Sequence, residues 1–111
     1  MAYKEQAGRG FKGDLRKIFD YLVYRDENVA SAVIDAIDLA IDGLLEDFRA
    51  DVKARNPILA SMGLFQISVK KHYSIYYTVN ETEKMVNFVY VCFSSEDPGR
   101  TQDNILGRFA H

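Results

Sequence analysis

The sequence predicts an α+β protein in which two N-terminal helices pack on one face of a three- to four-stranded antiparallel sheet. Two observations predict it. Apolar residues follow a period of about 3.6 as far as residue 48, and a period of two from residue 65 onward. Helices that precede all the clear strands, rather than alternate with them, are typical of the α+β class. A chain of 111 residues suits one domain, so we expect a single domain over residues 1–111.

The N-terminal quarter of the chain predicts one helix after a short polar segment. Residues 1–11 are polar and contain two glycines, so they suit either an edge strand or a loose arm. Residues 12–25 predict a helix with Asp14 in its first turn, where a carboxylate suits the helix dipole. Asn28 is the expected N-cap of the next helix. One face of the first helix collects its apolar residues: Leu15, Ile18, Phe19, Leu22 and Val23.

The second helix has the clearest pattern in the chain. Its apolar stripe consists of Ala30, Val33, Ile34, Ile37, Ile41, Leu44, Leu45 and Phe48. Its opposite face carries four carboxylates: Asp35, Asp38, Asp42 and Glu46. Acidic residues three or four apart share a face, but no histidine is nearby, so we interpret them as a solvated surface and expect no metal site. Asn56-Pro57 is expected to mark the end of helical structure.

Three strands are predicted between residues 65 and 93. Residues 65–70 and 73–79 alternate between apolar and polar, and the short link Lys71-His72 joins them as a hairpin. Residues 85–93 are apolar on both faces except at Asn87, which predicts a central strand. Pro98-Gly99 ends this segment, and residues 98–111 are expected to be a C-terminal tail, either a final helical turn or a mobile segment.

One face of the predicted sheet is expected to be open and polar, because both helices pack on the other face. Such a face, supported by a rigid scaffold, is where we expect function. It would be lined by Gln66, Ser68, Lys70, Ser74, Tyr76 and Thr78.

The composition excludes several classes of function. The net charge is −2, which gives no general attraction to nucleic acid or to an anionic membrane. The N-terminus has no apolar stretch of the secretory type, and the longest apolar runs are far too short to cross a membrane. The single cysteine, Cys92, lies in an apolar stretch and is expected to be a buried residue. We therefore expect a cytoplasmic protein without a membrane partner or a cofactor.

The order of these elements, together with several short segments, resembles the RelE/ParE toxin superfamily from about residue 12 to residue 97. The matching segments are residues 14–22 and 44–45 in the helices, and residues 63–69, 72–79 and 89–93 in the strands. The resemblance implies the toxin of a type II toxin–antitoxin system, of the plasmid-stabilisation type, which inhibits growth and is neutralised by a cognate antitoxin. It also implies assembly, as a homodimer or as a hetero-oligomer with the antitoxin.

The resemblance implies one of two targets, and the sequence departs from the pattern of one branch. Members that cut messenger RNA on the ribosome carry lysines and arginines on the open sheet face. Here Ser74 stands where an arginine usually follows the tyrosine, and Gln66 and Ser68 stand where basic residues are common. These departures favour a ParE-like toxin that binds DNA gyrase.

Two alternatives stay open, so the sequence does not decide whether the protein is an enzyme. In a ribosome-dependent endoribonuclease, a residue must take the proton of the ribose 2′-hydroxyl and cations must hold the phosphate. The catalytic residues would then be Lys70, His72, Tyr76 and Arg100, and the binding residues would be Lys71, Gln66 and Ser74. The other alternative is a non-toxic homologue that acts as a protein-binding module.

An antitoxin is expected to bind through an amphipathic helix or an added strand. The surfaces we expect to receive it are the one between the two helices and the one around Ile58, Leu59, Met62 and Leu64.

Overall fold

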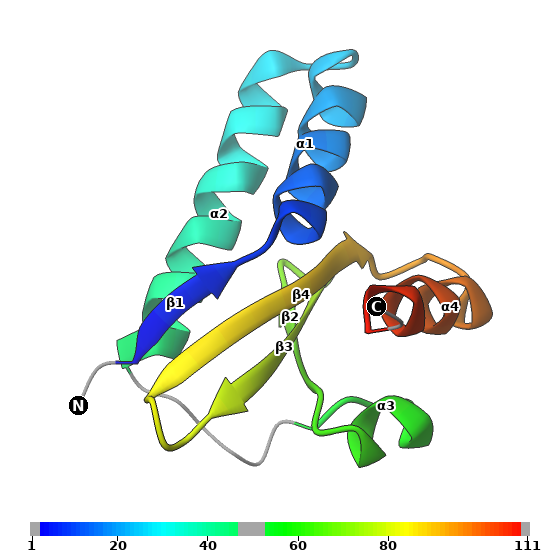
Figure 1. Ribbon diagram of the computed structural model, residues 1–111. Coiled ribbons are helices and arrows are strands. Elements are labelled where there is room, and N and C mark those ends of the chain that lie inside the picture. Colours follow the sequence, from blue (N-terminus) through cyan, green and yellow to red (C-terminus); the bar gives the residue numbers. More distant parts are fainter. Residues whose placement is uncertain (1–2, 47–52, 110–111) are drawn as a thin grey trace.

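A computed structural model describes residues 3–46 and 53–109 of the chain. The elements follow in the order β1 (Lys4–Ala7), α1 (Arg9–Val23), α2 (Glu27–Glu46), α3 (Pro57–Ser61), β2 (Phe65–Val69), β3 (Tyr73–Asn80), β4 (Met85–Phe93) and α4 (Pro98–Arg108). The predicted α+β class, with two N-terminal helices on a sheet, is confirmed (Figure 1). Phe48, which the sequence places on the stripe of the second helix, lies outside the described residues.

The four strands form one sheet in the order β1-β4-β3-β2. Strand β3 pairs antiparallel with both β2 and β4, but β1 pairs parallel with β4, with Lys4 opposite Met85 and Ala7 opposite Phe88. The sheet is therefore mixed, and mostly antiparallel. The central position predicted for residues 85–93 follows from this order, since β4 lies between β1 and β3.

Helices α1 and α2 pack side by side and cover one face of the sheet (Figure 1). Their buried residues repeat at helical spacing, as the sequence predicts. The core between helices and sheet includes Phe11, Ile18, Ala30, Val33, Ile37, Ile41, Ile75, Tyr77, Val86 and Phe88. No helix among the described residues is long and apolar enough to cross a bilayer.

Three helix starts differ from the sequence-based prediction. Helix α1 begins at Arg9, three residues before the expected start. The carboxylate of Asp26, and not Asn28, caps α2, because its Oδ1 accepts hydrogen bonds from the backbone N–H groups of Asn28 and Val29 at 2.8 and 3.3 Å. Pro57 does not end helical structure; it is the first residue of α3, and the side chain of Asn56 caps that helix. Proline suits the first position of a helix because its missing N–H has no intrahelical partner there.

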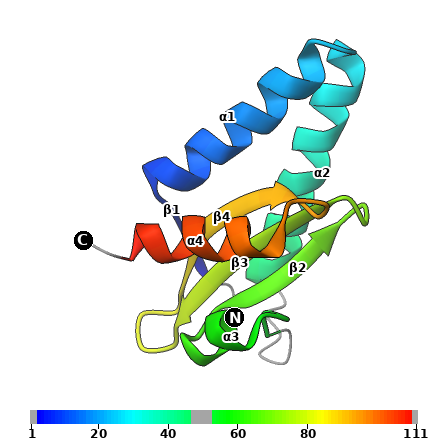
Figure 2. The same cartoon turned by 90° about the vertical axis from the view of Figure 1, so that its right-hand side faces the viewer.

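The reverse face of the sheet is largely covered, so the expectation of an open polar face is wrong at Ser74 and Tyr76, whereas Ser68 is exposed and Gln66 and Thr78 are half-buried. Helices α3 and α4 lie across it (Figure 2) and bury a second core made of Ala54, Leu59, Leu64, Tyr76, Tyr90, Cys92 and Ile105. Tyr76 is only 8% exposed, and Ser74 is buried beside it. The cause is α4: residues 98–108 form an eleven-residue helix rather than a loose tail, and Ile105 packs on the sheet.

The β2–β3 hairpin places its two lysines in the turn. Lys70 and Lys71 both have positive φ angles, 53° and 65°, and the N–H of His72 donates to the carbonyl of Val69 at 3.2 Å. This two-residue turn, with both central residues left-handed, matches the twist of the paired strands. Lys70 therefore belongs to the turn and not to the polar strand face where the sequence pattern puts it.

Candidate functional site

A cleft of about 540 Å³ opens on the reverse face, between α3, the β2–β3 hairpin and the start of α4. Four of the candidate catalytic and binding residues line it, namely Gln66, Lys71, Ser74 and Tyr76, and so does Ser68. Arg55, Ser94 and Glu96 also line it. Gln66 lies opposite Tyr76 in the β2–β3 register, which explains why residues from different strands meet in one place.

The polar residues of the cleft floor are bonded mainly to one another. The amide nitrogen of Gln66 donates to Ser74 Oγ at 3.5 Å, and its oxygen accepts from the backbone N–H of Arg55 at 3.2 Å. The hydroxyls of Ser74 and Ser94 are 3.0 Å apart. These bonds join the hairpin to the segment before α3 and to the residue after β4, so Gln66 and Ser74 have a structural role whatever binds above them.

The four candidate catalytic residues lie in three different places. Lys70 and His72 are exposed in the hairpin turn, and Arg100 is exposed on α4, where it lines a different groove. Tyr76 is buried, and burial raises the pKa of its phenol. Within residues 3–46 and 53–109, no hydrogen bond or ion pair joins any two of these four side chains.

A hydrogen-bonded network under α4 was missed in the sequence. The hydroxyls of Tyr90 and Thr101 donate to Glu96 Oε1 at 2.7 and 2.6 Å, and the amide nitrogen of Asn104 donates to the Tyr90 hydroxyl at 2.9 Å. Burial raises the pKa of the Tyr90 phenol. A signal for this helix was present: Asp97 caps α4 by accepting from the N–H of Arg100 at 3.1 Å, and proline follows the cap.

Cys92 has the chemistry of a buried residue and not that of a nucleophile. Its side chain belongs to the second core, on the reverse face of the sheet. Burial, and secondarily the carboxylate of Glu96, raises the pKa of its thiol from an ordinary 9.0 to about 12. The thiolate is the reactive form of cysteine, so the thiol is unreactive near neutral pH.

We expect the stability of the protein to fall as pH rises from about 9 towards about 12, partly because of Cys92. The thiol ionises in the unfolded chain above its ordinary pKa but stays protonated in the folded protein, so alkaline solution favours unfolding. The free energy of unfolding across this range should fall less steeply in a Cys92→Ala variant than in the wild type. Rapid labelling of the native thiol at pH 7.5 would contradict this account.

No group of three histidine, cysteine, aspartate or glutamate side chains that could hold a metal ion occurs in the described parts of the chain. The acidic row on α2 is exposed at Asp35, Asp38 and Asp42. Partial burial, followed by repulsion from the other two carboxylates, raises the pKa of Asp38.

The chain matches the family model described as the ParE toxin of the type II toxin–antitoxin system parDE, over residues 8–98. No curated protein sequence matches it. Among solved structures, a mutant of the Escherichia coli toxin RelE in the free state has 18% identity and a TM-score of 0.68, and the match covers 97% of this chain and 98% of that one. The chromosomal ParDE system of Pseudomonas aeruginosa has 16% identity, a TM-score of 0.65 and coverage of 83% and 96%. The RelBE2 toxin–antitoxin complex of Mycobacterium tuberculosis has 17% identity, a TM-score of 0.58 and coverage of 84% and 99%.

Proposed function

The chain belongs to the ParE toxin family of type II toxin–antitoxin systems, and on this premise we propose that it inhibits growth in the cytoplasm by binding DNA gyrase, without cutting RNA. The observation that carries the proposal is the dispersal of the groups that RNA cleavage would need. Lys70 and His72 are exposed in the hairpin turn, Arg100 is exposed on α4, and Tyr76 is buried under α3 and α4.

Cleavage of RNA by its own 2′-hydroxyl needs a base, cations around the phosphate and a proton donor for the leaving oxygen, all within hydrogen-bond reach of one phosphate. Among the described residues, the cleft offers Arg55 and Lys71 as cations and Glu96 as its carboxylate, and Glu96 already accepts hydrogen bonds from the hydroxyls of Tyr90 and Thr101. The net charge of −2 also gives little attraction to ribosomal RNA. Action by binding requires none of this machinery.

Induction of the protein in growing cells separates the two modes of action. We expect growth arrest and DNA breaks that depend on gyrase, with messenger RNA intact in the same cells. A Lys71→Ala/His72→Ala variant should retain its toxicity, because neither side chain has a catalytic role in this proposal. Transcripts cut within codons, and no longer cut in that variant, would show a ribosome-dependent endoribonuclease instead. No growth arrest at all would indicate a non-toxic homologue acting as a protein-binding module.

We further propose that a cognate antitoxin binds the protein in a hetero-oligomer, as in other type II systems. Of the four apolar residues considered for this contact, Leu59 and Leu64 are buried in the reverse-face core. Ile58 and Met62 are exposed and remain candidates. Copurification of a short protein encoded beside this one would support the proposal, and a homodimer that retains no such protein would count against it.

A further inference from the structure

The edge of β4 is only half covered by β1. The parallel pairing runs from Lys4 opposite Met85 to Ala7 opposite Phe88, and the chain then turns into α1 at Arg9. Residues 90–93 of β4 therefore pair with β3 on one side, after a bulge at Val89, and no strand among the described residues lies on their other side. An unpaired strand edge carries N–H and C=O groups that another strand can bind, unless side chains occupy them.

Two side chains form hydrogen bonds with the first of these backbone groups, as a residue of a neighbouring strand would. Arg108 Nη1 donates to the carbonyl of Val89 at 2.6 Å, and Asp14 Oδ2 accepts from the N–H of Val91 at 3.1 Å. A residue opposite Tyr90 in a continued parallel ladder would make these same two bonds. Arg108 and Asp14 also bind each other through both oxygens, at 2.6 and 2.7 Å. The ion pair thus extends the β1–β4 ladder by one position.

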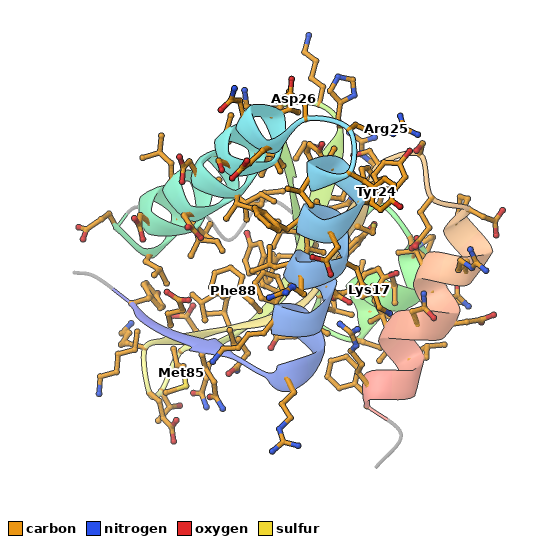
Figure 3. The ribbon with its side chains drawn as sticks, turned by 90° about the horizontal axis from the view of Figure 1, so that it is seen from above. Lys17, Tyr24, Arg25, Asp26, Met85 and Phe88 are labelled. Atoms are coloured by element: carbon orange, nitrogen blue, oxygen red, sulfur yellow. The ribbon has the colours of Figure 1, made fainter. Side chains whose placement is uncertain are left out.

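The next position along this edge lies in an open groove. Since alternate residues of a strand direct their backbone groups to the same side, the carbonyl of Val91 and the N–H of Phe93 point where no strand lies. A groove of about 630 Å³ follows this edge between α1 and α4. Lys17 and Tyr21 line its α1 side, and Arg100 and Asn104 line its α4 side. Figure 3 shows Lys17 on the side of α1 that faces α4.

The charged residues that line the groove have a positive balance, since Lys17, Arg100 and Arg108 outnumber Asp14 and Glu96. The carboxylate of Asp14 is bound by Arg108, and that of Glu96 is bound by Tyr90 and Thr101. Lys17 and Arg100 are exposed and have no ion pair within the described residues. We propose that this groove binds an extended, acidic segment of a partner protein, which adds to the edge of β4 as a strand. The backbone of this segment forms hydrogen bonds with the carbonyl of Val91 and the N–H of Phe93, and its carboxylates form ion pairs with Lys17 and Arg100.

Binding of a synthetic probe peptide to the full chain tests this inference. The probe is a capped octapeptide of alternating valine and glutamate, whose binding is followed by NMR through the amide signal of Phe93. We expect this signal to shift and saturate. A valine–lysine peptide should bind at least about tenfold more weakly, because it places like charges opposite Lys17 and Arg100. A valine–glutamate peptide with alternate N–H groups methylated should also bind more weakly, because it cannot complete the ladder.

Matched variants locate the binding site. Lys17→Glu/Arg100→Glu should weaken binding of the valine–glutamate peptide at least about tenfold, whereas Lys12→Glu/Lys70→Glu makes the same change in net charge outside the groove and should leave it within about twofold. Absence of binding, equal binding of the lysine peptide, or equal loss in both variants would overturn the proposal. The inference does not depend on the target of the toxin, since the assay contains neither gyrase nor ribosomes.

Discussion

Replacement of Arg108 by methionine is expected to lower the free energy of unfolding by about 3–5 kcal/mol, because it leaves the buried carboxylate of Asp14 without its partner. Asp14 is 6% exposed and lies between α1, β4 and α4. The same change removes the donor to the carbonyl of Val89. Urea denaturation followed by circular dichroism measures the loss.

Two further variants separate the cost of breaking the buried ion pair from the cost of losing an arginine side chain elsewhere. Arg16 and Asp20 form an exposed ion pair at 3.1 Å on the same helix, so Arg16→Met should cost less than about 1 kcal/mol. The double variant Asp14→Leu/Arg108→Met removes both charges and should recover much of the stability that Arg108→Met loses. If Arg108→Met and Arg16→Met cost the same, the ion pair does not hold α4 in place.

Replacement of Ile105 by alanine is expected to lower the free energy of unfolding by about 2–5 kcal/mol, the usual cost of a cavity in a packed core. Ile105 is fully buried, in the middle of the last helix, α4. Its side chain packs in the core that α4 forms with Tyr76, Tyr90 and Cys92. The variant therefore tests whether α4 is an integral layer of the fold. Urea denaturation is again the measurement.

Leu39→Ala is the matched control for this second core. Leu39 is exposed on α2, so truncating it should change the free energy of unfolding by less than about 0.5 kcal/mol. A similarly small effect of Ile105→Ala would mean that α4 does not pack stably on the sheet in solution. The reverse face would then be open, as the sequence pattern suggested.

The sequence predicted the helical pair and the three later strands because their apolar residues repeat over long segments. It did not predict that α3 and α4 cover the reverse face of the sheet. Alternation in β3 shows that Tyr76 and Ile75 point to opposite faces, but it cannot show whether the second face meets water or another helix. That depends on α4, whose few apolar residues give a weak periodic signal. Strand β1 is four mainly polar and exposed residues, so nothing local indicated its parallel pairing.

The candidate site was predicted in part for the same reason. Gln66, Ser74 and Tyr76 share a cleft because hairpin register follows from short-range pattern. Asp14 was interpreted as a first-turn residue of its helix, but α1 begins at Arg9 and Asp14 is buried against Arg108. These two residues are 94 positions apart, and a contact over that separation leaves no local trace in a single sequence.

Incubation of the purified protein with DNA gyrase and relaxed plasmid is the most direct test of the proposed action. We predict that supercoiling is inhibited and that cleaved plasmid accumulates, while messenger RNA on translating ribosomes treated with the same protein stays intact. Unchanged gyrase activity together with codon-specific cleavage of the ribosome-bound messenger would contradict the account.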